Sequence, residues 1–122
     1  MVERKIVKAA KILEKLLQER GIEIYKIVVF GSYARGKGEK ESDLDIIVVS
    51  ENFEDKDIFE RVKLASGIHR ELVEKIAMPV DVMYYSPIEW ERGSSLIINA
   101  AREEGEVVYG GQTDKIRGAI KD

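Results

Sequence analysis

Residues 43–50, which read DLDIIVVS, constrain the fold of this chain more than any other stretch. A short apolar run of β-branched residues predicts a strand that is covered on both faces. Because side chains alternate along a strand, Asp43 and Asp45 leave the same face about 7 Å apart. Ile47 and Val49 continue that face into the core. We therefore expect two carboxylates at the polar end of a buried strand.

The remaining sequence predicts one domain in which helices alternate with strands. Amphipathic spacing predicts helices over residues 2–20, 55–75 and 87–105, the last broken at Gly93, and β-rich runs predict strands over 24–30, 80–85 and 107–109. In the second helix, the stripe expected to face the core is Ile58, Val62, Ala65, Ile68, Leu72 and Ile76. Residues 1–110 are expected to form a single α/β domain, and residues 111–122 a loose tail.

The composition narrows the class of protein. The 122 residues include no cysteine, which excludes disulfides and thiolate metal sites, and no apolar run is long enough to cross a bilayer. The basic start lacks the apolar centre of a signal peptide, so we expect a cytoplasmic protein. A net charge of -3 gives no sign of a nucleic-acid partner. The charged fraction of 35%, mostly Glu and Lys, is typical of thermophile proteins.

Residues 30–49 contain two patterns that are typical of nucleotide-binding proteins. Gly31, Gly36 and Lys37 have the G-x-x-x-x-G-K spacing of a P-loop. A P-loop needs Ser or Thr after the lysine to hold magnesium, and a long helix that begins there. Gly38 occupies that position, and the next strand follows too soon for a helix. We therefore reject the P-loop interpretation.

The second pattern is Gly31-Ser32, ten residues, and then Asp43 and Asp45. A third carboxylate, Asp81, interrupts the apolar strand predicted over residues 80–85. If these strands pair, three carboxylates converge, and like charges 4 Å apart repel by roughly 4 kcal/mol at an effective dielectric constant of about 20. A cation relieves this repulsion, and oxygen ligands suit Mg²⁺. The alternative, that each aspartate is a strand-end cap or an ion-pair partner, would suit a lone aspartate better than this set.

Phosphate-binding groups precede the aspartates. Gly31 lets a ligand approach the backbone closely, and Ser32 adds a hydroxyl donor. Arg35 offers a guanidinium fork suited to phosphate, and Lys37 is a candidate helper. A plain strand-to-helix turn is the alternative for Gly-Ser alone. Facing a carboxylate cluster, these groups instead predict a site for a magnesium-bound nucleoside triphosphate.

The stretch GSYARGKGEKESDLDIIVV resembles the signature of the nucleotidyltransferase superfamily that includes the palm domain of DNA polymerase β. More narrowly, it is similar to the minimal nucleotidyltransferases, or MNT proteins, with their pattern Gly-Ser, ten residues, Asp-x-Asp. The resemblance implies a short mixed β-sheet with helices packed on it. It also implies transfer of a nucleoside monophosphate, here AMP from ATP, with release of pyrophosphate.

The resemblance also assigns roles to residues. It implies that Asp43 and Asp45 hold two Mg²⁺ ions, and that Gly31 and Ser32 hold the triphosphate. A third carboxylate on a neighbouring strand would complete the metal site and help to activate the acceptor hydroxyl. Asp81 is our choice for that third carboxylate, since it interrupts a strand after the motif.

Many MNT proteins are similar to antitoxins that adenylylate a tyrosine of a HEPN-domain ribonuclease toxin, so the resemblance implies such a partner. Two alternatives stay open. One is a small-molecule nucleotidyltransferase of the antibiotic-modifying type, which usually carries a second domain for its acceptor. The other is a binding module that neutralises its partner by contact alone.

The sequence leaves three conspicuous residues without an assigned role. His69 is expected at the edge of a helical stripe rather than in catalysis. Tyr33 could contact the nucleotide or pack against the turn, and Trp90 is expected in the core or at a partner interface. Apolar residues of the segment 90–101 would serve as a surface for a partner or for self-association.

Overall fold

The structure of the chain is a computed structural model, and it describes residues 4–31, 44–93 and 95–109. The described strands are β1 (Lys26–Phe30), β2 (Leu44–Val49), β3 (Val80–Tyr85) and β4 (Glu106–Tyr109). They form one sheet in the order β3-β2-β1-β4. β1 runs antiparallel to both β2 and β4, whereas β2 and β3 are parallel. The predicted mixed sheet is therefore confirmed.

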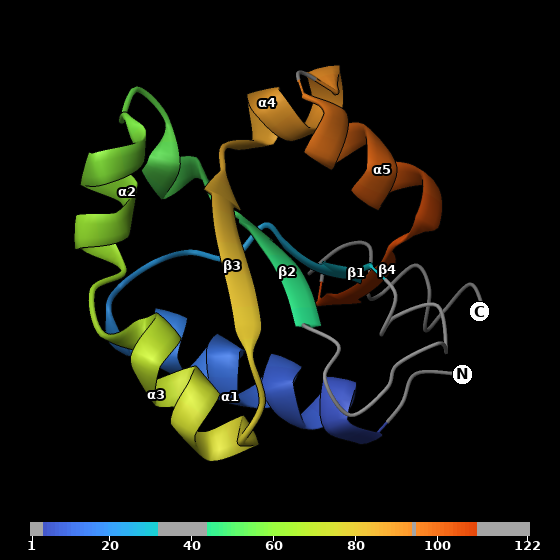
Figure 1. The fold of residues 1–122 in the computed structure, drawn as a ribbon. Coiled ribbons are helices and arrows are strands. Elements are labelled where there is room, and N and C mark those ends of the chain that lie inside the picture. The colour runs from blue at the N-terminus through green and yellow to red at the C-terminus, as the bar shows by residue number, and fades with distance from the viewer. Residues whose placement is uncertain (1–3, 32–43, 94, 110–122) are drawn as a thin grey trace.

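Helices cover both faces of this sheet, which gives three layers (Figure 1). The described helices are α1 (Arg4–Glu19), α2 (Ile58–Leu64), α3 (Ile68–Ile76), α4 (Pro87–Arg92) and α5 (Leu96–Glu104). α1 and α3 pack on one face, α4 and α5 on the other, and α2 lies beside the edge strand β3 (Figure 1). Within the described residues, no helix combines the length and the apolar character that crossing a membrane requires.

The central strand β2 joins the two halves of the core. Leu44, Ile46 and Val48 are buried in the cluster beneath α1 and α3, and Ile47 and Val49 are buried against α4 and α5. The predicted alternation is confirmed, since every residue of β2 except the half-buried Asp45 is buried. Burial of both faces fixes the register of this strand, because a slip of one residue would exchange its two faces.

The helix predicted over residues 55–75 is two helices, and that prediction was wrong. Asp57 begins α2 with a capping box completed by Glu60, and α2 ends at Leu64. Gly67 then adopts a positive φ of 87° and redirects the chain into α3. An L-residue rarely adopts this conformation, so the glycine separates the two helices.

The break changes which residues of the predicted stripe are buried. Ala65, Ile68, Leu72 and Ile76 are buried as expected. Ile58 and Val62 are not, with 67% and 54% of their surface exposed. Because the chain changes direction at Gly67, the apolar residues of α2 and those of α3 face different directions, and of the two helices only α3 buries apolar residues in the core.

Predictions for α4 and its surroundings agree with the structure. Ser86 and Glu89 form the predicted capping box at the start of α4, and Gly93 ends that helix with a positive φ of 63°. Trp90 is buried among the residues beneath α4 and α5, which confirms the core interpretation. A single turn of 3-10 helix, Glu51–Phe53, was not predicted. The predicted tail, residues 111–122, lies outside the described residues.

Two isoleucines of the predicted stripe provide a matched test of the split. Ile68 is fully buried and Ile58 is 67% exposed. We expect Ile68→Ala to lower the free energy of unfolding by about 2–5 kcal/mol, because it leaves a cavity in the core. Ile58→Ala should change it by less than about 0.5 kcal/mol. Urea denaturation measures both values. Equal losses for the two variants would show that α2 buries its stripe after all.

Candidate active site

Two of the predicted carboxylates lie side by side at one end of the sheet. Asp45 on β2 and Asp81 on β3 are direct partners in the parallel register, so both side chains leave the same face. Neighbouring strands are about 4.8 Å apart, which places the two carboxyl groups within reach of one cation. Asp45 is half-buried and Asp81 is exposed. The expected pairing of the strands that carry Asp45 and Asp81 is confirmed.

Gly31 comes directly after β1 and packs against the first of these carboxylates. Phe30, the last residue of β1, is the antiparallel partner of Asp45. Gly31 has a φ of 91°, and a Cβ atom built on it would lie 2.3 Å from Oδ2 of Asp45. Real Cβ atoms do not come so close, so a larger residue here would displace the Asp45 carboxylate, and the positive φ itself favours glycine. The two ends of the sequence motif therefore meet.

Asp45 and Asp81 line a cavity of about 810 Å³. This volume is within the range of about 300–1,000 Å³ that is usual for small-molecule sites. Apolar side chains from β1, α2, β3 and α5 form part of its wall, among them Phe30, Val62 and Ile97. The described polar residues of the lining, besides the two aspartates, are Lys63, Ser66, His69 and Tyr84. The cavity thus has two neighbouring carboxylates in a wall that is otherwise largely apolar.

His69 lies on the cavity wall, a position that the sequence interpretation did not anticipate. Its side chain is exposed, as expected for the edge of the stripe. Its Nε2 atom hydrogen-bonds the backbone carbonyl of Val80, the residue before Asp81. Because a carbonyl can only accept, Nε2 carries the proton. The histidine therefore ties α3 to the start of β3, next to the second carboxylate.

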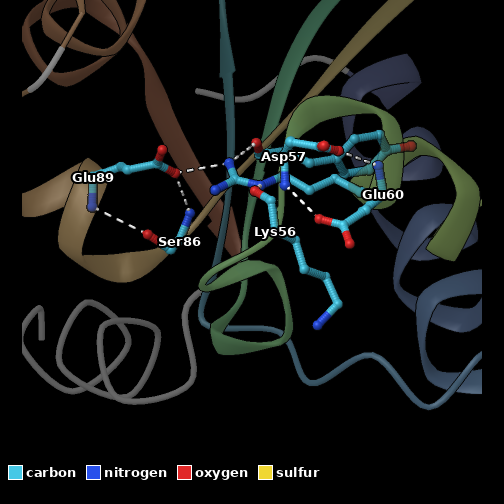
Figure 2. A network of polar contacts seen from close by, with 7 residues as sticks. Lys56, Asp57, Glu60, Ser86 and Glu89 are labelled. Carbon is cyan, nitrogen blue, oxygen red and sulfur yellow. Dashed lines mark hydrogen bonds and ion pairs between the residues drawn. The ribbon is translucent and has the colours of Figure 1, made fainter.

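Arg61 ties α2 to the other end of β3. Its Nε atom donates to the carbonyl of Lys56 at 2.9 Å, and its Nη1 atom donates to the carbonyl of Tyr84 at 2.9 Å and to Oε1 of Glu89 at 2.8 Å. Only 11% of the Arg61 side chain is exposed. Figure 2 shows the network, with Lys56 at the start of α2 on one side and Ser86 and Glu89 of α4 on the other. Sequence reasoning missed this residue.

The side chains of two residues in this network have shifted pKa values. Burial raises the pKa of Glu89, but hydrogen bonds from Arg61 and from Ser86 outweigh it, so the pKa is below its ordinary value. Burial raises the pKa of Tyr84 to about 12, against a weaker lowering by the charge of Arg20. Glu89 is therefore an anion and Tyr84 a neutral phenol at physiological pH, so Tyr84 is not a general base.

The remaining predicted site residues lie outside the described residues, namely Ser32, Arg35, Lys37 and Asp43. The structure thus brings together Gly31, Asp45 and Asp81 and leaves the others as predictions. Among the residues it describes, no group of three His, Cys, Asp or Glu side chains is placed to hold a metal. Asp43, the third predicted ligand, precedes the first residue of β2 in the sequence.

Two glycines with positive φ test the contact between Gly31 and Asp45. Gly31→Ala and Gly21→Ala both force alanine into the left-handed region, which costs about 1–2 kcal/mol of stability. Only at Gly31 does the new Cβ atom meet a carboxylate, since no described atom lies within 4 Å of it at Gly21. We expect Gly31→Ala to weaken binding of Mg²⁺ and AMP-PNP at least tenfold, and Gly21→Ala to leave it unchanged. Calorimetric titration measures both affinities. Equal affinities for the two variants would contradict the contact between Gly31 and Asp45.

Comparisons with known sequences identify the family. The family model of the nucleotidyltransferase domain matches residues 8–108. Two proteins of Methanocaldococcus jannaschii, each named as a candidate protein adenylyltransferase, are similar to the chain. The first is 31% identical over 62% of this chain, and the second is 32% identical over 70%. The match spans half the length of the first relative and 79% of the second.

Comparisons with solved structures agree with this result. A toxin–antitoxin structure with AMP-PNP matches 91% of this chain and 81% of its own, with 25% identity and a TM-score of 0.60. A candidate minimal nucleotidyltransferase matches 87% and 95%, with 23% identity and a TM-score of 0.54, and shows the same fold. The expected minimal nucleotidyltransferase fold is confirmed, and the chain belongs to the nucleotidyltransferase domain family of enzymes.

Proposed function

We propose that the chain is a Mg²⁺-dependent adenylyltransferase that transfers AMP from ATP to a tyrosine of a HEPN-domain toxin, and so acts as an antitoxin. One observation carries the proposal. Asp45 and Asp81 are in register on parallel strands, with Gly31 packed against Asp45, at the edge of a cavity of about 810 Å³. This arrangement suits a metal-bound triphosphate better than a structural role for the two aspartates.

The residues present fit a magnesium site. Carboxylate oxygens are the ligands that Mg²⁺ prefers, and it usually binds through one or two carboxylates together with phosphate oxygens. Asp45 and Asp81 supply such a pair, and Asp43 would add a third carboxylate. Side by side, the negative charges repel each other, and a cation removes this repulsion. When bound, the metal would neutralise the charge that develops on the phosphate oxygens.

The stretch after β1 would hold the triphosphate. Gly31 is partly exposed and packs against Asp45, so the stretch that follows it begins beside the carboxylates. Ser32 would donate its hydroxyl, and Arg35 and Lys37 would bind phosphate oxygens as cations. These contacts would orient the α-phosphate towards the open side of the cavity, where the acceptor enters.

The reaction would be an in-line displacement at the α-phosphorus of ATP. The tyrosine oxygen forms a bond to that phosphorus, the bond to the bridging oxygen breaks, and pyrophosphate leaves. The phenolic proton must go to a base. Asp81, the more exposed of the two described carboxylates, is the candidate that can reach an acceptor from outside.

The choice of a protein acceptor is supported by the names of similar proteins. Two relatives carry the name of candidate protein adenylyltransferases. A toxin–antitoxin structure that holds AMP-PNP has the same fold at 25% identity. The names of the relatives favour a protein over an antibiotic as the acceptor, and the AMP-PNP of the similar structure favours ATP as the donor.

We expect Asp45→Asn to slow transfer strongly without unfolding the protein. The amide keeps the shape of the side chain but is a poor ligand for Mg²⁺, so several kcal/mol of transition-state stabilisation are lost. We expect the rate to fall by roughly 100-fold or more, since about 1.4 kcal/mol corresponds to a factor of ten. The measurement follows radioactive AMP from α-labelled ATP onto the HEPN partner.

A matched control is Asp55→Asn. Asp55 is exposed and has a φ of 61°, a conformation that asparagine tolerates. This variant should transfer AMP at the wild-type rate. Undiminished transfer by folded Asp45→Asn protein would refute the mechanism. Full neutralisation of the toxin by that variant, with no transfer, would instead favour a partner that is inhibited by contact alone.

A further inference from the structure

Five large apolar side chains are exposed on two helices that flank the candidate active site. Ile58, Phe59 and Val62 of α2 are 67%, 82% and 54% exposed, and Leu96 and Ile97 of α5 are 87% and 43% exposed. We call these five residues the apolar rim. Single exposed apolar side chains are ordinary on protein surfaces, whereas a group beside a cavity marks a binding surface.

The apolar rim is continuous with the catalytic cavity. Val62 from α2 and Ile97 from α5 both line the cavity that holds Asp45 and Asp81. On the α2 side, a second cavity of about 340 Å³ lies next to it. The two cavities share four wall residues, Val62, Val82, Met83 and Tyr84. Ile58 and Val62 form part of the wall of this smaller cavity. A large side chain of a bound protein would fit there, as anchor residues do at interfaces.

The apolar face of α2 is exposed although the helix is firmly attached. Of its seven residues, 58–64, none is buried. The capping box of Asp57 and Glu60 fixes its start, and the guanidinium of Arg61 fixes it to β3 and α4 (Figure 2). Polar contacts thus hold the helix in place and leave its apolar side chains free to contact a partner. A surface that is ordered before binding loses less entropy when it binds.

We propose that the apolar rim is the docking surface for the acceptor protein, and that it delivers the acceptor hydroxyl to Asp45 and Asp81. This inference rests on the proposed function and adds the place and chemistry of recognition. The five residues carry no charge, whereas a nucleic acid would require several Lys or Arg side chains to neutralise its phosphates. The partner therefore presents an apolar segment around its reactive tyrosine.

The test uses Phe59→Glu and Leu96→Glu. Neither residue is among the described lining of either cavity, and both lie in the first turn of a helix, where an acidic side chain is tolerated. Calorimetry measures binding of the HEPN partner without nucleotide, and separately binding of AMP-PNP with Mg²⁺. We expect each variant to bind the partner at least tenfold more weakly and AMP-PNP as tightly as the wild type does.

Val7→Glu is the matched control. Val7 is 39% exposed, a fraction similar to the 43% of Ile97. It belongs to α1, however, on the opposite side of the sheet (Figure 1). It should leave both affinities unchanged, and Phe59→Ser should reproduce the loss of partner binding without adding a charge. Unchanged partner binding by Phe59→Glu and Leu96→Glu would overturn the inference, as would no binding by the wild type.

Self-association is a distinct outcome. If light scattering shows a wild-type dimer that the two rim variants dissociate while partner binding persists, the rim joins copies of this chain and the inference fails. The two tests fail in different ways. If the proposed function is wrong, Asp45→Asn transfers AMP at an undiminished rate, whereas the rim variants still bind the partner more weakly.

Discussion

The parallel pairing of β2 with β3 is the interaction on which the site depends. It sets Asp45 directly beside Asp81 on one face of the sheet. A slip of one residue would send one carboxylate to the opposite face, among the side chains beneath α1 and α3. The alternation of buried residues along β2 opposes such a slip, since either face would lose its apolar contacts. The candidate active site is thus a consequence of how the core is packed.

β3 is an edge strand, and side chains from two helices stabilise it there. His69 of α3 hydrogen-bonds the carbonyl of Val80 at one end, and Arg61 of α2 hydrogen-bonds the carbonyl of Tyr84 at the other. Covering the edge groups of a sheet reduces unwanted pairing with other chains. These bonds also attach α2 and α3 to the strand that carries Asp81, so the wall of the cavity and one of its carboxylates are held by the same contacts.

Much of this arrangement could be predicted because it follows from local rules. Alternation along a strand placed Asp45 on the face of Ile47, and the interruption of an apolar strand identified Asp81. The division between α2 and α3 was missed, because Ile58 and Val62 continue a helical period that Ile68 and Leu72 complete. Gly67 was the signal for a break, and the capping box at Asp57 and Glu60 marked the start of α2. Arg61 gave no such signal, since its contacts join residues 23 and 28 positions apart.

We propose that Asp45 and Asp81 together hold the metal that binds the nucleotide. A crystal structure of the chain with Mg²⁺ and AMP-PNP tests it most directly. The account predicts Mg²⁺ in the cavity, at about 2.0–2.1 Å from carboxylate oxygens of both aspartates and from phosphate oxygens of the nucleotide. A nucleotide bound with its metal in contact with neither aspartate would contradict the account.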